Sequence, residues 1–169
     1  RDFGWIGTLD LVERLEADGI RHVPLRYATR GWSLTSDAQA LAELYSVFRN
    51  LQPDIVHTHN PKPGVYGRLA AKAARVPAIV NTQHGLYATE DDRPAKRAAV
   101  YGLERLAATC SDAELIQNEE DLATLARLRV PRRKLTLLGN GIDLARFDPE
   151  AIDPDAVVAL RQDLDPDGD

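Results

Sequence analysis

Short apolar segments alternate with longer amphipathic segments along this chain, and this alternation restricts the possible folds more than any other feature. Four short segments are strand-like: 54–59, 78–83, 114–118 and 134–139. Between them, apolar residues recur at intervals of three and four, which is the period of a helix packed on a core. Strands that alternate with helices form parallel sheets, and continuously apolar runs such as "DIV" and "AIV" are typical of strands covered on both faces. We therefore predict an α/β protein with a parallel sheet and helices on both faces.

Capping and stop signals predict where the helices begin and end. The predicted helices lie at 8–18, 36–51, 64–75, 94–110, from Asn118 onward, and at 154–164. Ser36 and Gln39 form a capping box before the second helix, and Pro53 closes that helix. In the fourth helix an apolar stripe is expected to face inward: Ala99, Leu103, Leu106 and Cys110. Residues 22–27 are a further strand candidate, weakened by Pro24.

Composition narrows the class of protein. The chain of 169 residues is 44% hydrophobic and 28% charged, which is typical of a soluble globular domain. Its formal net charge of -5 argues against a nucleic acid partner, which requires a basic surface. Cys110 is the sole cysteine, so an internal disulfide is excluded. The chain begins at Arg1 and contains no Met, so we expect it to be a fragment of a longer protein.

Polar residues and glycines follow the strand-like segments at the points where these segments end. They are His59-Asn60, Gln83-His84-Gly85, Gln117-Asn118 and Gly139-Asn140-Gly141. In an open parallel sheet, ligands bind in the crevice beyond the carboxyl ends of the strands. The sequence therefore predicts a binding site at this edge of the sheet.

The individual residues of this edge have structural readings as well as functional ones. His57 lies inside a strand, which favours a buried, hydrogen-bonded histidine over a ligand, whereas His59 lies at the mouth and suits either role. Gly64 can simply begin a helix, but a helix that begins after Lys62 is also a natural anion site. Asn118 is expected to act mainly as a helix cap.

His84 is the residue for which a functional role is favoured, because neutral imidazole is the commonest general base near physiological pH. A metal site formed by His57, His59 and His84 remains an alternative, since three nitrogens and a water can hold zinc. Glycine-rich phosphate loops of the GxGxxG and Walker types are absent, as is a GxSxG nucleophile elbow. A basic cluster is expected to be solvated surface or to contact anionic lipid headgroups: Arg127, Arg129, Arg132, Arg133 and Lys134.

Three segments together resemble the N-terminal domain of the family 4 retaining glycosyltransferases, which have the GT-B fold. They are "DIVHTHNPKPGVYGRLAAKAARVPAIVNTQHGLYA", "ELIQNEEDL" and "KLTLLGNGIDLARFDP", of which "GNGIDLARF" is the most specific. The resemblance runs from about residue 9 to 161. It implies a Rossmann-like N-terminal domain that binds the acceptor and faces a second domain that binds the nucleotide-sugar donor.

The resemblance also implies roles for the residues at the strand ends. His84, in the "QHG" turn, corresponds to a residue near the transferred sugar and is the candidate catalytic or sugar-orienting group. The other residues of this edge are candidate substrate contacts: His59, Asn60, Lys62, Gly64, Gly85, Asn118, Asn140 and Gly141. Asn140 and Gly141 correspond to the turn before the crossing to the second domain, where an Asn-Gly pair suits a positive φ. Neither a cofactor nor a metal ion is implied for the chemistry.

Parts of the family pattern lie outside the sequence. The first strand with its glycine-rich turn is expected before Arg1, and the donor-binding domain after Asp169. We therefore predict a partial domain over 1–150 and the start of the crossing segment over 151–169. The isolated chain is expected to be inactive and marginally stable, with exposed strand edges.

The whole protein is then expected to be a hexosyltransferase. It would act on a lipid-linked or soluble acceptor in cell-envelope polysaccharide synthesis. The resemblance implies a cytoplasmic location and allows peripheral attachment at the inner face of the plasma membrane. Two alternatives stay open: a metal-dependent hydrolase that uses the three histidines, and a non-catalytic module that binds a sugar or a protein.

Overall fold

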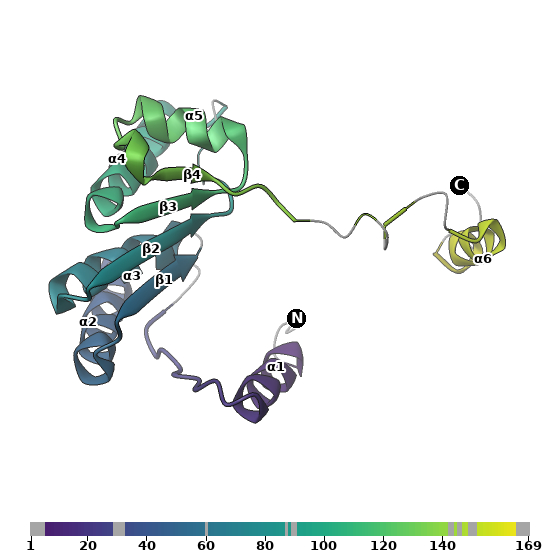
Figure 1. Ribbon diagram of the computed structural model, residues 1–169, viewed down its shortest axis with the longest axis horizontal. Helices are drawn as coiled ribbons and strands as arrows, with labels where there is room; N and C mark the ends of the chain where they lie inside the picture. Colours follow the sequence, from purple (N-terminus) through teal and green to yellow (C-terminus); the bar gives the residue numbers. More distant parts are fainter. Residues whose placement is uncertain are drawn as a thin grey trace. The chain divides into compact units, whose positions relative to one another are not determined.

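The structure is a computed structural model that describes residues 6–28, 33–59, 61–86, 88, 91–141, 144, 147–148 and 152–164. The chain divides into two compact units, Arg1–Leu138 and Gly139–Asp169. The first unit contains α1 (Ile6–Ala17), α2 (Leu34–Leu51), β1 (Ile55–His59), α3 (Pro61–Ala74), β2 (Ala78–Gln83), α4 (Pro94–Cys110), β3 (Ala113–Ile116), α5 (Glu119–Arg127), the 3₁₀ helix Arg132–Lys134 and β4 (Leu135–Leu137) (Figure 1). The second contains α6 (Pro154–Leu164). The domain boundary at residue 150 stays a prediction.

The first unit is built on one sheet of four parallel strands in the order β1-β2-β3-β4 (Figure 1). In its register, His59 lies beside Thr82, Gln83 beside Ile116, and Ile116 beside Leu137. The carboxyl ends of the strands therefore meet at one edge. The parallel α/β sheet predicted from the alternation of segments is confirmed.

Helices α3, α4 and α5 connect successive strands, and right-handed crossovers place them on one face of the sheet. Two apolar clusters form the core beneath them: Val56, Ala71 and Ile79 in one, and Ala108, Ile116, Leu125 and Val130 in the other. The opposite face of β1 carries exposed side chains at Ile55, His57 and His59. The helix layer that we predicted for this second face is not seen among the described residues.

Helix α2 begins earlier than its sequence suggests. Its N-cap is Ser33, whose Oγ accepts a hydrogen bond from the backbone N–H of Ser36 at 3.4 Å. The Asp37 carboxylate accepts in return from the backbone N–H of Ser33 at 3.1 Å. The capping box predicted at Ser36 and Gln39 is therefore wrong, because Asp37 supplies the reciprocal acceptor for a cap three residues earlier.

Residues 22–27 form no strand. Pro24 lacks the N–H that a ladder requires. The backbone N–H groups of Arg26 and Tyr27 instead donate to the carboxylate of Glu43 in α2, at 3.0 Å and 3.3 Å. A side chain thus satisfies the backbone that a neighbouring strand would otherwise have paired.

Helix α4 has the predicted bounds but buries a different face. Its buried residues are Glu104, Ala107 and Ala108, whereas Leu106 of the predicted stripe is 51% exposed. Glu104 lies on the buried side because its carboxylate forms an ion pair with Arg68 of α3 at 2.8 Å. The prediction relied on the spacing of apolar residues and assumed that charged residues face solvent. It therefore selected the wrong face of α4.

Candidate functional site

Two histidines from neighbouring strands meet at the carboxyl edge of the sheet. His59 is the last residue of β1, and His84 follows the last residue of β2. His59 Nδ1 lies 3.0 Å from His84 Nε2, a hydrogen-bonding distance, and both side chains are exposed. Partial loss of hydration around the ring, followed by the nearby His57 and His84, lowers the pKa of His59 below its ordinary value. His59 is therefore expected to be neutral at physiological pH, so it can pair with His84 without charge repulsion.

His57 extends this pair into a row of three rings. The ring centroids of His57 and His59 are 4.2 Å apart, and those of His59 and His84 are 5.3 Å apart. His57 Nε2 lies 2.8 Å from Thr82 Oγ1 on β2, so the predicted hydrogen bond is present. The prediction that His57 is buried is wrong, because it points to the exposed face of β1.

The row of rings is not arranged as a metal site. The facing nitrogens of His59 and His84 bond to each other, and a nitrogen of His57 bonds to Thr82. Among the residues that the structure describes, no group of three or more His, Cys, Asp or Glu side chains could hold a metal ion. The alternative based on these three histidines therefore has no ligand set in the described part of the chain.

The turn after β2 is fixed by its own side chains. Gly85 has φ +134°, a conformation that residues with a Cβ rarely adopt. The buried Gln83 side chain reaches past His84, and its Nε2 donates to the Gly85 carbonyl oxygen at 3.0 Å. The residues on the two sides of His84, Gln83 and Gly85, are thus bonded to each other and restrain its backbone.

A cavity of about 830 Å³ adjoins this turn. It is lined by Gly85, Leu86, Ala88, Tyr101, Asn118, Glu120, Asp121, Ala123, Thr124 and Arg127. Asn118 is the N-cap of α5, and its Oδ1 accepts from the backbone N–H of Asp121 at 2.7 Å, as predicted for a cap. Gly85 and Asn118, two of the predicted contacts, therefore lie on the wall of one cavity.

Lys62 and Gly64 lie in the first turn of α3, which begins at Pro61 rather than after Lys62. Pro61 and Pro63 have no N–H, so this helix end presents fewer donors to an anion than most do. Lys62 Nζ forms an ion pair with Asp37 of α2 at 2.8 Å. The contact of Lys62 with substrate stays a prediction.

Gly64 is buried against β2. A Cβ on this glycine would lie 2.9 Å from the side-chain oxygen of Asn81. Tight packing against Asn81 therefore explains the glycine, and its contact with substrate also stays a prediction.

The structure does not test three other predicted contacts. Asn60 lies outside the described residues. Asn140 and Gly141 belong to the second unit, so their place in the site stays a prediction. The positive φ expected at Asn140-Gly141 occurs instead at Gly139, with φ +70°.

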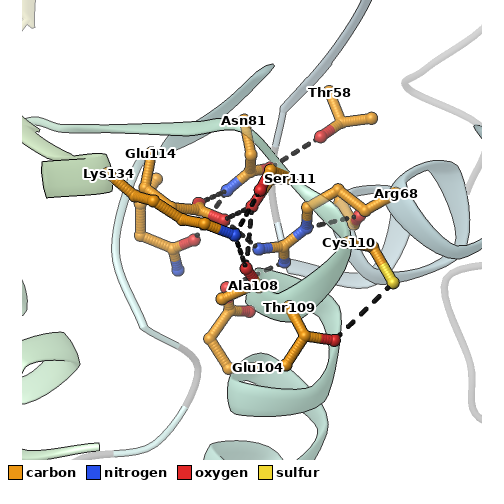
Figure 2. Close-up of polar contacts among 12 residues, drawn as sticks. Thr58, Arg68, Asn81, Glu104, Ala108, Thr109, Cys110, Ser111, Glu114 and Lys134 are labelled. Atoms are coloured by element: carbon orange, nitrogen blue, oxygen red, sulfur yellow. Dashed lines mark hydrogen bonds and ion pairs between the residues drawn. The ribbon is translucent and has the colours of Figure 1, made fainter. Parts of the chain in front are cut away.

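Sequence reasoning missed a buried polar network that includes Thr58 and Asn81, residues of the two strands that carry the histidines (Figure 2). Arg68, whose side chain is fully buried, donates to Glu104 and to Glu114, each at 2.8 Å. Asn81 Nδ2 donates to the second oxygen of Glu114 at 2.8 Å, and Thr58 Oγ1 donates to Asn81 at 2.8 Å. The available signal was weak: polar residues at inward strand positions, such as Asn81 and Glu114, within otherwise apolar runs.

The predicted basic cluster does not form one surface. Arg127 bonds to Thr124 at the large cavity, and Lys134 Nζ donates to the carbonyl oxygens of Ala108 and Ser111 at the end of α4 (Figure 2). Lys134 also lines, together with Arg129 and Arg133, a hollow of about 280 Å³ that is separate from the cavity beside Arg127. Within the described residues, no helix combines the length and the apolar character needed to cross a membrane.

The chain is similar in sequence to several bacterial glycosyltransferases. The chain is 34% identical over 133 residues to a UDP-Gal:alpha-D-GlcNAc-diphosphoundecaprenol alpha-1,3-galactosyltransferase of Escherichia coli, covering 78% of this chain and 34% of the relative. It is 32% identical over 158 residues to the putative glycosyltransferase EpsD of Bacillus subtilis, covering 87% and 41%. It is 28% identical over 127 residues to the capsular polysaccharide biosynthesis glycosyltransferase CapM of Staphylococcus aureus, covering 70% and 32%. The chain thus spans between 32% and 41% of the length of these curated relatives.

A solved structure supports the fold alone. The UDP-N-acetylglucosamine 2-epimerase of Rickettsia bellii matches with a TM-score of 0.59 at 19% identity, over 93% of this chain and 42% of the epimerase. Residues 7–141 match the family described as "Glycosyl transferase 4-like domain". This confirms the resemblance inferred from the motifs: the chain belongs to the glycosyl transferase 4-like domain family.

Proposed function

We propose that this chain is the acceptor-binding part of a retaining glycosyltransferase, and that His84 is its catalytic or sugar-orienting residue. One observation carries the proposal: His84 pairs with His59 at the carboxyl edge of the sheet, beside a cavity that Gly85 and Asn118 line. Crevices at this edge are where open α/β sheets bind ligands. The family membership supplies the class of reaction.

The proposed role of His84 follows from how its ring is held. Neutral His59 can donate a hydrogen bond from Nδ1 to His84 Nε2. Because Nε2 then acts as the acceptor, the single N–H of a neutral His84 ring is at Nδ1. That N–H would then donate to a hydroxyl of the transferred sugar. Such a preorganised donor would orient the sugar while its bond to the nucleotide diphosphate breaks.

The cavity is suited to a sugar rather than to a diphosphate. Its volume of about 830 Å³ lies within the range of roughly 300–1,000 Å³ usual for ligand sites. Its wall carries two carboxylates, Glu120 and Asp121, against one guanidinium, Arg127. Carboxylates accept hydrogen bonds from hydroxyl groups but repel phosphates. We therefore assign the sugar of the acceptor to this cavity, with Asn118 as a further hydroxyl partner.

The substrates of the whole protein are also proposals. By analogy with the Escherichia coli relative, the donor would be a UDP-sugar and the acceptor a sugar on a polyprenyl diphosphate. The donor would bind to a domain outside this chain, and the reaction would take place at the cytoplasmic face of the membrane. Chain 1–169 alone is expected to be inactive, because it would lack that donor site.

The test is to measure sugar transfer by the full-length protein and its His84→Ala variant. UDP-galactose and GlcNAc-diphosphoundecaprenol are the first donor and acceptor to use. Loss of an acid–base or charge-stabilising group should lower transfer about 100-fold or more. His22→Ala is the matched control, since His22 is exposed and belongs to the segment before α2, outside the strands of the sheet. Transfer by His84→Ala within a few-fold of wild type would show that the assigned role is wrong.

A further inference from the structure

Gln83, the buried residue before His84, forms a hydrogen bond across the turn that follows β2. Gln83 is fully buried, and its Nε2 donates to the carbonyl oxygen of Gly85 at 3.0 Å. This bond closes a short loop around His84 and joins the residues on its two sides. The Gly85 backbone, at φ +134°, has wide conformational freedom because it has no Cβ. Gln83 therefore supplies a restraint that the glycine itself lacks.

Behind Gln83 the restraint continues into the protein. Asn81 Nδ2 lies 3.5 Å from Gln83 Oε1 and donates to Glu114 at 2.8 Å. Glu114 in turn accepts from Arg68 and from Ser111 (Figure 2). These side chains come from β2, β3, α3 and the end of α4, so the polar chain links the turn to several elements at once.

The same network also reaches the first turn of α3 and the end of β1. Arg68 Nε donates to the Gly64 carbonyl oxygen in the first turn of α3 at 2.9 Å. Asn81 packs so closely against Gly64 that a Cβ there would lie 2.9 Å from its oxygen. Thr58, one residue before His59, donates to Asn81 at 2.8 Å. The residues beside both histidines are therefore bonded to one buried group of side chains.

Stability alone does not account for such a network. Burying charged groups costs desolvation energy, and apolar replacements of buried ion pairs are often neutral or stabilising. A fully hydrogen-bonded buried network does fix orientation, because each member has few alternative partners. We propose that Gln83 is a positioning residue for His84. The buried polar chain through Asn81, Glu114 and Arg68 anchors it. This inference rests on the proposed role of His84.

The test uses the full-length protein carrying Gln83→Leu, which keeps most of the buried volume but removes both amide bonds. Ser111→Ala is the matched control: it removes a bond to Glu114 in the same network but does not touch the turn. With UDP-galactose and GlcNAc-diphosphoundecaprenol, Gln83→Leu should lower kcat by about tenfold or more and leave KM within about twofold. Ser111→Ala should change kcat by less than about twofold, because Arg68 and Asn81 still hold Glu114 in place.

Two readouts separate positioning from a general structural effect. In a His84→Ala background, Gln83→Leu should cause no further loss of kcat, because it acts through the missing ring. The ring signals of His84 and His59, followed by NMR in histidine-labelled protein, should move in Gln83→Leu but not in Ser111→Ala. Losses that multiply in the double variant, or unchanged ring signals, would overturn the proposal.

These measurements also separate the catalytic role of His84 from the positioning role of Gln83. If His84→Ala retains transfer, the proposed catalytic role is wrong, yet the ring signals still decide whether Gln83 positions the turn. Should Gln83→Leu fail to fold, Gln83→Asn provides the same comparison, because its shorter amide stays polar but does not reach the Gly85 carbonyl. Unmoved ring signals in that variant would likewise refute the positioning role.

Discussion

Replacement of Arg68 by Met tests how much the buried ion pairs of Arg68 contribute to the stability of the fold. Arg68 is fully buried and pairs with Glu104, 2% exposed, and with Glu114, fully buried. The Met side chain fills much of the same space but leaves two carboxylates without their cation. Removing one partner of a buried ion pair costs about 3–5 kcal/mol. For a domain of this size each kcal/mol corresponds to about 2–4 °C, so Tm should fall by about 6–20 °C.

The assay is thermal unfolding of the full-length protein at pH 7, followed by a signal from the N-terminal domain. A compensated variant, Arg68→Met with Glu104→Gln and Glu114→Gln, removes the stranded charges and should recover most of the loss. The deficit of the single variant should also shrink as pH falls, because protonation removes the unpaired buried negative charge. A loss below about 1 kcal/mol, or a triple variant no more stable than the single one, would refute the assignment of this ion network.

Two further changes test the packing of α3 and the protonation of His59. Gly67→Ala places a Cβ 2.5 Å from Thr58 Cγ2, whereas Gly102→Ala meets nothing within 4 Å. Both substitutions gain the same helix propensity, so urea unfolding should show Gly67→Ala less stable than Gly102→Ala by about 1–3 kcal/mol, and equal stabilities would contradict the packing. The pKa of His59 is lowered from its ordinary value of 6.5, so the folded chain binds fewer protons there than the unfolded chain. Stability should therefore fall as pH drops below about 6.5, and by less in His59→Asn; identical pH profiles would show that His59 is not the cause.

Much of the fold was predictable because its signals are local. Strands β1 and β2 are marked by apolar runs, and α4 begins at Pro94, where a proline suits the first helical turn. The cap of α2 was misplaced because both Ser33 and Ser36 are suitable caps, and the choice between them depends on Asp37, which bonds back to Ser33. Local patterns identify the elements, but competition between similar caps is resolved by a single side-chain contact.

The buried face of α4 could not be predicted for a different reason. Glu104 and Arg68 are 36 residues apart and become partners only after α3 and α4 pack together. Each alone resembles a solvated charge at an amphipathic surface. Lys62 illustrates the same limit at the site, since its pairing with Asp37 depends on the packing of α3 against α2. Periodicity carries no information about which charges will meet.

The polar network and the apolar core divide the interior between them. One apolar cluster includes Val56 and Ile79, and the other includes Ile116 and Leu125. The network contains Asn81 of β2 and Glu114 of β3, which are bonded to each other. Apolar packing alone would allow neighbouring strands and helices to settle in several nearly equivalent ways. The directional bond from Asn81 to Glu114 favours one alignment of β2 with β3. The bond from Thr58 to Asn81 does the same for β1 and β2, whose alignment brings His84 to His59.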